Sequence, residues 1–505
     1  MIKERLFAAI SVGSQSVTLK IYDTRLEKAI ETRKADVSIG SDIYTYKEIE
    51  HTTVLNTCNA LAGFVQAMKE YGVTQWRAVA TSSVQEATNA YYIKEQIYRK
   101  TGLELEWLSN AEERYLHNQA VAYGTDNFQQ FIHDGTMLID IGSGSIQLTV
   151  YNEGNFQFSR NIKLGPLRVR ELLKDLERKV SQFTELMEDF ILSKIDAYQQ
   201  FATPKVKIEH FILIGTDLLA FKRAFTKKNR EWITREHFDG IYNTILSHPE
   251  QELTKKYMVS LDAVSQLLPS AMLVKKLLEW TGAKKIFLST VDLVDGLIVH
   301  EYMRNKKKRS DAFLYADILE AAKQMAAHYQ CTEKDRVSVE KFALHLFDRL
   351  KSLHGLKKRD RLLLQLGVIL RNIGSFVTVN SHYLHSYYLI KSTELIGISE
   401  EEQLIVANLA RYHSWLTPTE DGMHFDTIQT DVRLRIAKLA AILRVADALN
   451  DSKQQKITSI RVSVKEEEIV ITPNSKYDLS LERWTFIDKA EYFEKVYGKK
   501  LNFRG

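Results

Sequence analysis

The chain has 505 residues, of which 45% are hydrophobic and 26% charged, a composition typical of a globular protein with several domains. Its net charge of +5 is low for a dedicated nucleic-acid-binding protein, and no apolar run approaches the ~20 residues that a membrane span needs. The two cysteines, Cys58 and Cys331, show neither metal-ligand spacing nor a disulfide framework, and no signal peptide precedes the first strand-like run. The sequence therefore predicts a cytoplasmic protein with no membrane segment and no specific nucleic-acid partner.

The positive charge is clustered in three segments, at residues 227–230, 304–309 and 357–359. Runs of this kind usually lie on solvated loops and helix ends. The alternative is a track for a polyanion, which has a purpose only if the chain also carries a phosphate site. The sequence leaves both interpretations open.

A tight turn of small residues interrupts the first strand-like segment. Residues 6–22 read as two strands around Gly13, Ser14, Gln15 and Ser16, because an apolar run enters the turn and an alternating run leaves it. The elements expected next are a helix at 46–71, a strand at 76–80, a helix at 86–100, a strand at 103–108 and a helix that begins at Ser109 or Asn110.

Residues 136–151 repeat the first pattern, with an apolar strand, a glycine–serine turn and an alternating strand. The similarity between 7–21 and 137–150 is the most informative feature of the sequence. It predicts two related β-hairpins within residues 1–305, each of which opens its own α/β lobe. Two such lobes enclose a cleft, with one hairpin turn on each side.

The rest of the chain changes character near residue 305. Further strands are expected at 156–163, 211–214 and 285–289, whereas the pattern from 311 to 453 is almost wholly helical. Strands at 457–464 and 468–472 and an amphipathic helix at 489–497 follow. The sequence therefore predicts four domains: a first lobe at 1–125, a second lobe at 126–305, a helical domain at 306–453 and a small α+β domain at 454–505.

A glycine–serine turn between strands suits phosphate binding, because small residues let backbone N–H groups approach an anion and hydroxyl groups add donors. Most such turns bind nothing, so one turn alone indicates little. Two equivalent turns that open two lobes indicate a phosphate-binding cleft. The candidate donors are Gly13, Ser14, Ser16, Gly142, Ser143, Gly144 and Ser145.

Several segments resemble, in order, the motifs of the exopolyphosphatase/guanosine pentaphosphate phosphatase (Ppx/GppA) family. They are residues 8–16 (AAISVGSQS), 80–89 (ATSSVQEATN), 108–113 (LSNAEE), 139–148 (IDIGSGSIQL) and 163–165 (KLG) with Arg168 and Glu171. The resemblance covers nearly the whole chain. It implies an actin-like (ASKHA, ribonuclease H-like) pair of α/β lobes, an all-α HD-like domain, a small α+β appendage and a homodimer.

In this family the second glutamate of the E-E pair activates the attacking water, so the resemblance gives Glu113 the role of general base. Composition alone would explain Glu112 and Glu113 as first-turn helix residues that complement the helix dipole. The resemblance also implies that Asp140 binds Mg²⁺ and that the turn residues bind phosphate. The substrate it implies is inorganic polyphosphate or guanosine pentaphosphate.

Several motif positions depart from the family pattern. The aspartate of the first motif is Ser11, the arginine of the second is Gln85, and the glutamate that ends the later phosphate motif is Gln147. The family's G-T-G-G-T segment is Gly215-Thr216-Asp217-Leu218-Leu219. Because Mg²⁺ takes hard anionic oxygen ligands, the loss of two carboxylates predicts a weakened site at Asp140.

The helical domain departs from an HD-type metal site in a similar way. Such a site uses a His, a His-Asp pair and a later Asp, because imidazole and carboxylate together suit a divalent metal. These positions hold Asp335, Arg371-Asn372 and Asp447, and an arginine cannot be a metal ligand. The histidines that remain nearby are His382, His385 and His413. We expect no stoichiometric metal in this domain, and a role as scaffold and polyanion surface.

Two functions remain open. The first is hydrolysis of a terminal phosphoanhydride of inorganic polyphosphate or guanosine pentaphosphate, with Glu113 as base and Asp140 as Mg²⁺ ligand. The second is a polyphosphate- or nucleotide-binding regulatory protein that kept the fold and lost turnover, which the substituted motifs favour.

Overall fold

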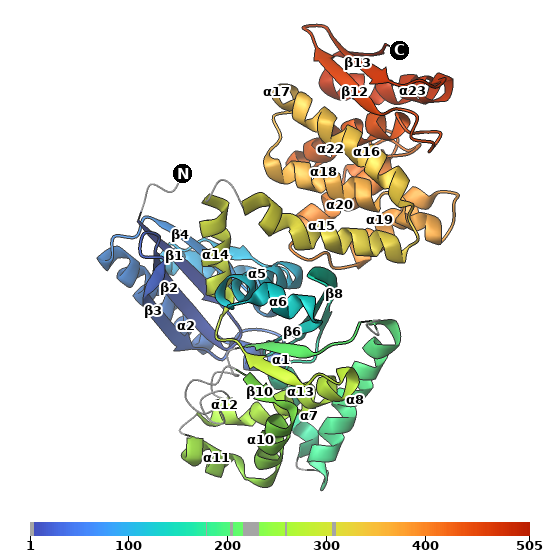
Figure 1. Ribbon diagram of the computed structural model, residues 1–505. Helices are drawn as coiled ribbons and strands as arrows, with labels where there is room; N and C mark the ends of the chain where they lie inside the picture. The colour runs from blue at the N-terminus through green and yellow to red at the C-terminus, as the bar shows by residue number, and fades with distance from the viewer. Residues whose placement is uncertain are drawn as a thin grey trace. The chain divides into compact units, whose positions relative to one another are not determined.

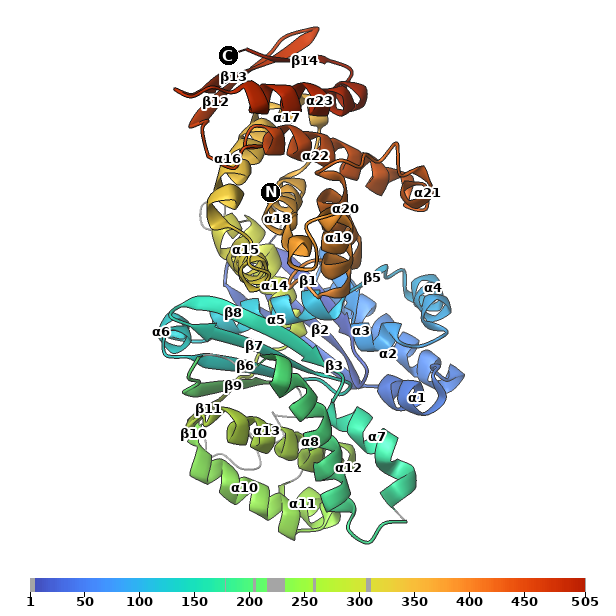
Figure 2. The same cartoon turned by 90° about the vertical axis from the view of Figure 1, so that its right-hand side faces the viewer.

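The computed structural model describes residues 5–177, 179–202, 206–215, 232–257, 260–305 and 310–504. These residues form two compact units, Met1–Asp317 and Ile318–Gly505 (Figures 1 and 2). Across the described ranges, no helix has the length and apolar character needed to cross a membrane. The basic residues 227–230 and 306–309 lie outside these ranges.

The first unit begins with a five-stranded sheet in the order β3-β2-β1-β4-β5. β2 runs antiparallel to both neighbours, whereas β1, β4 and β5 are parallel. β1 is almost continuously apolar and buried, as expected for a central strand covered on both faces. The strands are β1 Leu6–Val12, β2 Ser16–Asp23, β3 Lys28–Asp36, β4 Gln75–Ala80 and β5 Leu105–Trp107.

The second sheet repeats this topology. Its order is β8-β7-β6-β9-β11-β10, so its first five strands correspond to β3-β2-β1-β4-β5 and β10 is added at the edge. β6 and β7 form the antiparallel hairpin that the sequence repeat predicts. The strands are β6 Thr136–Ile141, β7 Ile146–Asn152, β8 Asn155–Ile162, β9 His210–Ile214, β10 Trp232–Thr234 and β11 Lys285–Leu288.

Helices cover both faces of the second sheet, with α5 and α6 on one side and α8, α10 and α13 on the other (Figure 2). The helices of the first unit are α1 Ile39–Tyr46, α2 His51–Glu70, α3 Ser82–Gln85, α4 Ala90–Thr101, α5 Asn110–Gly124, α6 Phe128–His133, α7 Pro166–Glu177, α8 Phe183–Ala202, α10 Arg235–Ser247, α11 Glu250–Tyr257, α12 Leu261–Ser265, α13 Leu267–Thr281 and α14 Leu293–Asn305.

α14 returns to the first sheet. It packs against β1 and β2 and crosses α5, which itself lies against β6. A Cβ atom on Gly296 would lie 2.4 Å from the carbonyl oxygen of Leu116 in α5, so the crossing requires glycine. The predicted second lobe, 126–305, contains α14, whereas the structure places this helix on the sheet of the first lobe.

Two edge strands of the first unit are missing from the sequence prediction. β3 mixes charged, small and apolar residues with no apolar alternation and lies at a largely exposed edge. β10 has three residues, which is too short for a pattern. Both depend on a neighbouring strand for their conformation, since β3 pairs with β2 and β10 pairs with β11.

The second unit contains helices and a three-stranded sheet, β12-β13-β14 (Figure 2). The predicted helix at 489–497 begins earlier, at Ser480, and this helix, α23, packs against α22 and β14. The HD-like character of the unit stays a prediction. Its elements, with the preceding α15, are α15 Ser310–His328, α16 Glu333–Arg349, α17 Lys351–His354, α18 Lys358–Leu370, η1 Ile373–Phe376, α19 His382–Ser392, α20 Glu400–Tyr412, α21 Gly422–Phe425, α22 Thr430–Ala448, β12 Ser459–Val464, β13 Glu468–Asn474, α23 Ser480–Tyr497 and β14 Lys500–Phe503.

The crossing of α14 and α5 gives a stability test. Gly296→Ala is expected to destabilise the first unit by about 1–3 kcal/mol, because the added methyl group meets the Leu116 carbonyl. Gly240→Ala is the matched control. Among the described residues, no atom outside the backbone of α10 lies within 4 Å of its Cβ position, and α10 should gain ~1 kcal/mol of helix propensity. Scanning calorimetry measures both changes. Equal changes in the melting temperature of the two variants, in the same direction, would contradict the close crossing of α14 and α5.

Candidate functional site

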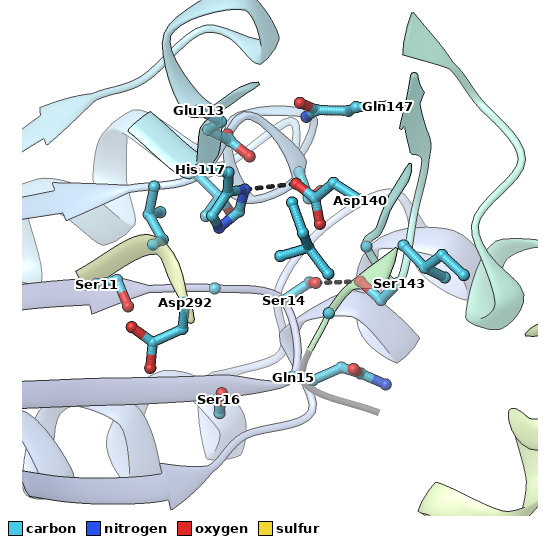
Figure 3. A pocket seen from close by; sticks show the side chains of 18 of the residues that line it. Ser11, Ser14, Gln15, Ser16, Glu113, His117, Asp140, Ser143, Gln147 and Asp292 are labelled. Carbon is cyan, nitrogen blue, oxygen red and sulfur yellow. Dashed lines mark hydrogen bonds and ion pairs between the residues drawn. The ribbon is translucent and has the colours of Figure 1, made fainter. Parts of the chain in front are cut away.

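The turns of the two hairpins meet in one cavity (Figure 3). Each turn is closed in the same way, since the Gly13 N–H donates to the Ser16 carbonyl at 2.9 Å and the Gly142 N–H to the Ser145 carbonyl at 3.0 Å. The Ser14 and Ser143 hydroxyl groups form a hydrogen bond across the cavity. The two turns therefore face each other, as the sequence repeat predicts. The predicted phosphate ligands that line the cavity are Gly13, Ser14, Ser16, Gly142, Ser143 and Ser145.

Gly144, predicted with them, is not part of the lining. Its carbonyl oxygen accepts a hydrogen bond from Nε of Arg168 at 2.7 Å. A Cβ atom on Gly144 would lie 2.0 Å from the Tyr44 hydroxyl oxygen, so the residue packs against α1. Only the backbone N–H of Gly144 remains a candidate phosphate donor.

Glu113 enters the cavity from the first turn of α5. Ser109 caps this helix and Glu112 completes the capping box, so the two neighbouring glutamates have different surroundings. The Glu113 carboxylate is 8% exposed and accepts a hydrogen bond from the Ser82 backbone N–H. Burial raises the pKa of Glu113 to about 7, although the Ser82 contacts oppose the shift. A carboxyl group with this pKa is suited to take a proton from water near neutral pH.

His117 lies one turn after Glu113 on α5 and forms an ion pair with Asp140 through Nδ1 (Figure 3). Burial alone would lower the pKa of His117, but the Asp140 carboxylate raises it above its ordinary value. No sequence motif singles out His117. Its spacing from Glu113, one turn along the same helix, is the signal that points to the cavity.

Ser11 and Gln147, where the resemblance expects carboxylates, both line the cavity, whereas Gln85 is absent from the described lining. Asp140 and Gln147 are partners across the β6–β7 ladder, so their side chains lie side by side. Gln147 is 5% exposed, and its side-chain oxygen has no hydrogen-bond partner among the described residues.

The cavity offers oxygen ligands that suit Mg²⁺ in part. The Asp140 carboxylate and the unpartnered Gln147 oxygen are neighbours, and Mg²⁺ is usually held by one or two carboxylates together with substrate phosphates. However, His117 engages Asp140, and a further carboxylate of the lining, Asp292, is paired with Lys20 at 3.0 Å. Within the described ranges, no group of three or more His, Cys, Asp or Glu side chains is arranged to hold a metal. These oxygen ligands therefore fit a Mg²⁺ ion that is also bound by phosphate oxygens of a substrate.

In the second unit, a buried arginine bridges two of the predicted ligand positions. Arg371 is 2% exposed; its Nη2 lies 2.5 Å from Oδ2 of Asp335 and its Nε lies 3.0 Å from Oδ1 of Asp447. Asn450 donates a further hydrogen bond to Asp335 at 2.9 Å. Burial would raise the pKa of Asp447, but Arg371 lowers it below its ordinary value. A guanidinium thus lies between the carboxylates that an HD-type site would use for a metal.

His382 and His413 lie together beside this triad. Their Nε2 atoms are 3.4 Å apart, and their Nδ1 atoms lie 3.2 and 2.7 Å from the backbone carbonyl oxygens of Val379 and Ala410. Burial lowers the pKa of His413 to about 3, so this imidazole is neutral. His385 takes no part in this contact.

The basic segment 357–359 is partly used inside the second unit. Nε and Nη2 of Arg359 donate to the Glu402 carboxylate at 2.7 and 2.6 Å, and Lys357 is the N-cap residue of α18. Arg359 therefore has a structural role, and the polyanion track stays a prediction.

Glu113→Gln is expected to stabilise the first unit near pH 8 and to change little near pH 4.5. The pKa of Glu113 is raised from 4.5 to about 7, so its contribution to stability is lost as the pH rises through 7. The amide avoids that loss, which amounts to ~3 kcal/mol at about 1.4 kcal/mol per pKa unit. Urea unfolding across this pH range measures it, with Glu112→Gln as control. Parallel stability curves for the wild type and Glu113→Gln would contradict the raised pKa.

Protein purified without chelator is expected to carry no stoichiometric Mn, Fe or Zn in the second unit, because the Arg371 guanidinium bridges Asp335 and Asp447. Elemental analysis tests this, and about one equivalent lost on His413→Ala would contradict it. Arg371→Met, which removes the cation that pairs with both Asp335 and Asp447, should destabilise the unit by about 3–5 kcal/mol.

Comparison with known proteins gives consistent matches. The profile of the Ppx/GppA phosphatase family matches residues 21–305, and that of Ppx/GppA phosphatase domain III matches residues 319–489. A bifunctional 3-dehydroquinate synthase/phosphatase from Fusobacterium nucleatum is 21% identical over 322 residues, which are 60% of this chain and 47% of that protein. A guanosine-5'-triphosphate,3'-diphosphate pyrophosphatase from Photobacterium profundum is 21% identical over 481 residues, 92% of this chain and 91% of that protein. The chain thus spans less than half of the first relative and most of the second.

Solved structures share the fold. The Aquifex aeolicus member of the Ppx/GppA family has a TM-score of 0.50 at 19% identity, covering 60% of this chain and 99% of that one. An exopolyphosphatase from Cytophaga hutchinsonii has a TM-score of 0.52 at 16% identity, covering 59% of this chain and 97% of that one. These likenesses agree with the actin-like, two-lobed architecture predicted for the N-terminal part. Because its profile matches more than half of the chain, this protein belongs to the Ppx/GppA phosphatase family.

Proposed function

We propose that this protein is a phosphoanhydride hydrolase of the exopolyphosphatase type, which releases terminal phosphate from inorganic polyphosphate or from guanosine pentaphosphate. The observation that carries the proposal is the place of Glu113. A buried carboxyl group with a pKa raised to about 7 opens into the cavity that both hairpin turns line. This arrangement suits attack by water on a bound phosphoryl group.

The turns would hold the phosphoryl group from two sides. Phosphoryl transfer depends mainly on positioning and on stabilisation of charge, which converging N–H and hydroxyl donors supply. Ser14 and Ser143, now bonded to each other, would exchange that hydrogen bond for phosphate oxygens. The proposed donors are the backbone N–H groups of Ser14, Ser143 and Gly144 and the hydroxyl groups of Ser14, Ser16 and Ser145. The N–H groups of Gly13 and Gly142 close their own turns instead, by donating to the Ser16 and Ser145 carbonyls.

Glu113 would accept the proton of the attacking water, and its hydrogen bond from the Ser82 N–H fixes the orientation of the carboxylate. The positive charge that the Asp140 contact favours on His117 would lie beside the phosphate oxygens. Mg²⁺, held by Asp140 and the Gln147 oxygen together with the substrate, would supply further positive charge to the phosphoryl group.

The cavity lining favours a phosphate chain over a nucleoside as the group held inside. The described lining contains no Phe, Tyr or Trp, the side chains on which a guanine base would stack. The names of the similar proteins include both a guanosine-5'-triphosphate,3'-diphosphate pyrophosphatase and an exopolyphosphatase. We therefore propose inorganic polyphosphate as the first substrate to test. The cytoplasmic location and the homodimer stay predictions.

Glu113→Gln should lower Mg²⁺-dependent phosphate release from polyphosphate by about 100-fold or more, because an amide cannot accept the proton from water. Glu112→Gln is the matched control, since glutamine still completes the capping box with Ser109. In the wild type, kcat/KM should rise as the pH increases through about 7 and Glu113 ionises. Strong activity that survives Glu113→Gln would show that another group is the base.

A binding protein without turnover is the second candidate. The observation that favours it is the engagement of Asp140 by His117 in a cavity where Ser11 and Gln147 are neutral. Backbone N–H groups bind anions without these carboxylates, and fewer acids make the cavity less negative. Phosphate binding would then persist where metal-dependent chemistry does not.

The double variant Ser11→Asp plus Gln147→Glu separates the two candidates. If the missing carboxylates limit the chemistry, Mg²⁺-dependent phosphate release should rise at least tenfold, which needs about 1.4 kcal/mol of transition-state stabilisation. Adding Glu113→Gln should abolish the gain. No gain in a folded protein that still binds polyphosphate would support the binding protein.

A further inference from the structure

Three consecutive carbonyl groups of the β6–β7 turn face the segment at residues 165–168. A Cβ atom on Gly165 would lie 2.5 Å from the Gly142 carbonyl oxygen and 2.2 Å from that of Ser143. The Ser143 carbonyl accepts the backbone N–H of Arg168 at 3.1 Å, and the Gly144 carbonyl accepts Nε of the same residue at 2.7 Å. Arg168 thus holds two adjacent peptide groups, one through its backbone and one through its side chain.

The direction of these carbonyls fixes the direction of the next N–H groups. In a trans peptide the C=O and the following N–H point in opposite directions. The N–H groups of Ser143, Gly144 and Ser145 therefore point away from Arg168, on the side of the turn opposite the segment 165–168. Successive N–H groups with a common direction form an anion-binding concavity, and Ser143 and Ser145 line the cavity described above.

The other end of the Arg168 side chain contacts the first lobe. Its Nη2 donates to Glu86 Oε2 at 2.7 Å, and its guanidinium lies 4.6 Å from the centre of the Tyr44 ring. Lys163 reaches the second oxygen of Glu86 at 3.0 Å. The side chains of Arg168 and Glu86 are 17% and 30% exposed, so the ion pair is partly shielded from water. Because the guanidinium is planar, its N–H groups donate in fixed directions, and this side chain therefore sets the geometry between the two lobes.

Two neighbours make this contact relevant to the proposed chemistry. Leu167, next to Arg168, is buried in the apolar core of the first lobe, which anchors the start of α7 there. Glu86 directly follows α3, the short helix whose Ser82 N–H holds the Glu113 carboxylate. One side chain therefore connects the phosphate turn of the second lobe with the segment that orients the proposed base in the first.

We propose that Arg168 is a positioning residue that sets the direction of the phosphate-binding N–H groups at residues 143–145 and fixes their register with Glu113 through Glu86. The inference rests on the proposed phosphate site. It makes the contact between the lobes and the alignment of the phosphate donors depend on the same side chain.

Three variants test this inference. Arg168→Lys keeps the positive charge and removes the planar guanidinium, which donates to both Gly144 and Glu86. Arg170→Lys is the matched control, on the same helix, with Glu250 at 4.0 Å as its ion-pair partner. Glu86→Gln removes the negative charge from the contact in the first lobe and leaves the hydrogen bond from Arg168 to Gly144. Amide hydrogen exchange at 143–145 and at 81–86 measures how firmly the phosphate turn and the α3 segment are held. Binding of methylenediphosphonate, whose P–C–P bridge resists hydrolysis, reports the phosphate site without turnover.

Arg168→Lys should exchange the amides at 143–145 about tenfold faster than Arg170→Lys and bind methylenediphosphonate about tenfold more weakly. Glu86→Gln should speed exchange at 81–86 and lower kcat about fivefold, with KM within about twofold of wild type. The double variant should stay within about twofold of Arg168→Lys alone, because both changes act on one contact.

The outcomes separate this inference from the proposed hydrolase. The inference would be overturned if Arg168→Lys and Arg170→Lys had the same amide exchange rates at 143–145 and the same affinity for methylenediphosphonate, whatever the activity of the wild type. If the exchange and binding results are as expected but the wild type releases no phosphate, the hydrolase fails and the positioning role stands.

Discussion

A phosphoryl group carries its charge on several oxygens, so the proposed hydrolysis requires hydrogen-bond donors from more than one direction. One turn presents its N–H groups on one side only. The chain supplies the second side by repeating one strand order in two sheets, so that the turns after β1 and β6 reach the same cavity. The helices α5 and α14 fill the space between the sheets and hold the turns at that distance.

Much of this fold follows from local sequence, and the exceptions have physical causes. The hairpins β1–β2 and β6–β7 were predictable because an apolar run, a small-residue turn and an alternating run each leave a mark within a few residues. β3 leaves no such mark, since its residues lie on an exposed edge and its conformation depends on pairing with β2. The return of α14 to the first sheet cannot be predicted from local sequence either, because its partners β1 and β2 are distant in the chain.

The candidate site divides in the same way. The turn residues and Glu113 are found from motifs, whereas His117 gains its meaning from a tertiary contact with Asp140 on another element. Asp292 lines the cavity beside Lys20, which comes from the start of the chain. The sequence excludes Arg371 as a metal ligand, but its place between Asp335 and Asp447 emerges only when helices α16, α18 and α22 are packed. Burial, which raises the pKa of Glu113, is likewise a property of the assembled lobes.

The place of α14 has a consequence for synthesis. This helix covers β1 and β2, yet it follows the whole second sheet in the chain. A ribosome adds roughly 5–20 residues per second, so the first sheet waits tens of seconds for the helix that covers it. The strands of the second sheet are made during that interval, and β1 and β2 lack the cover of α14 until it ends. The lobe that is made first is thus completed by a helix that the ribosome adds only after the second sheet.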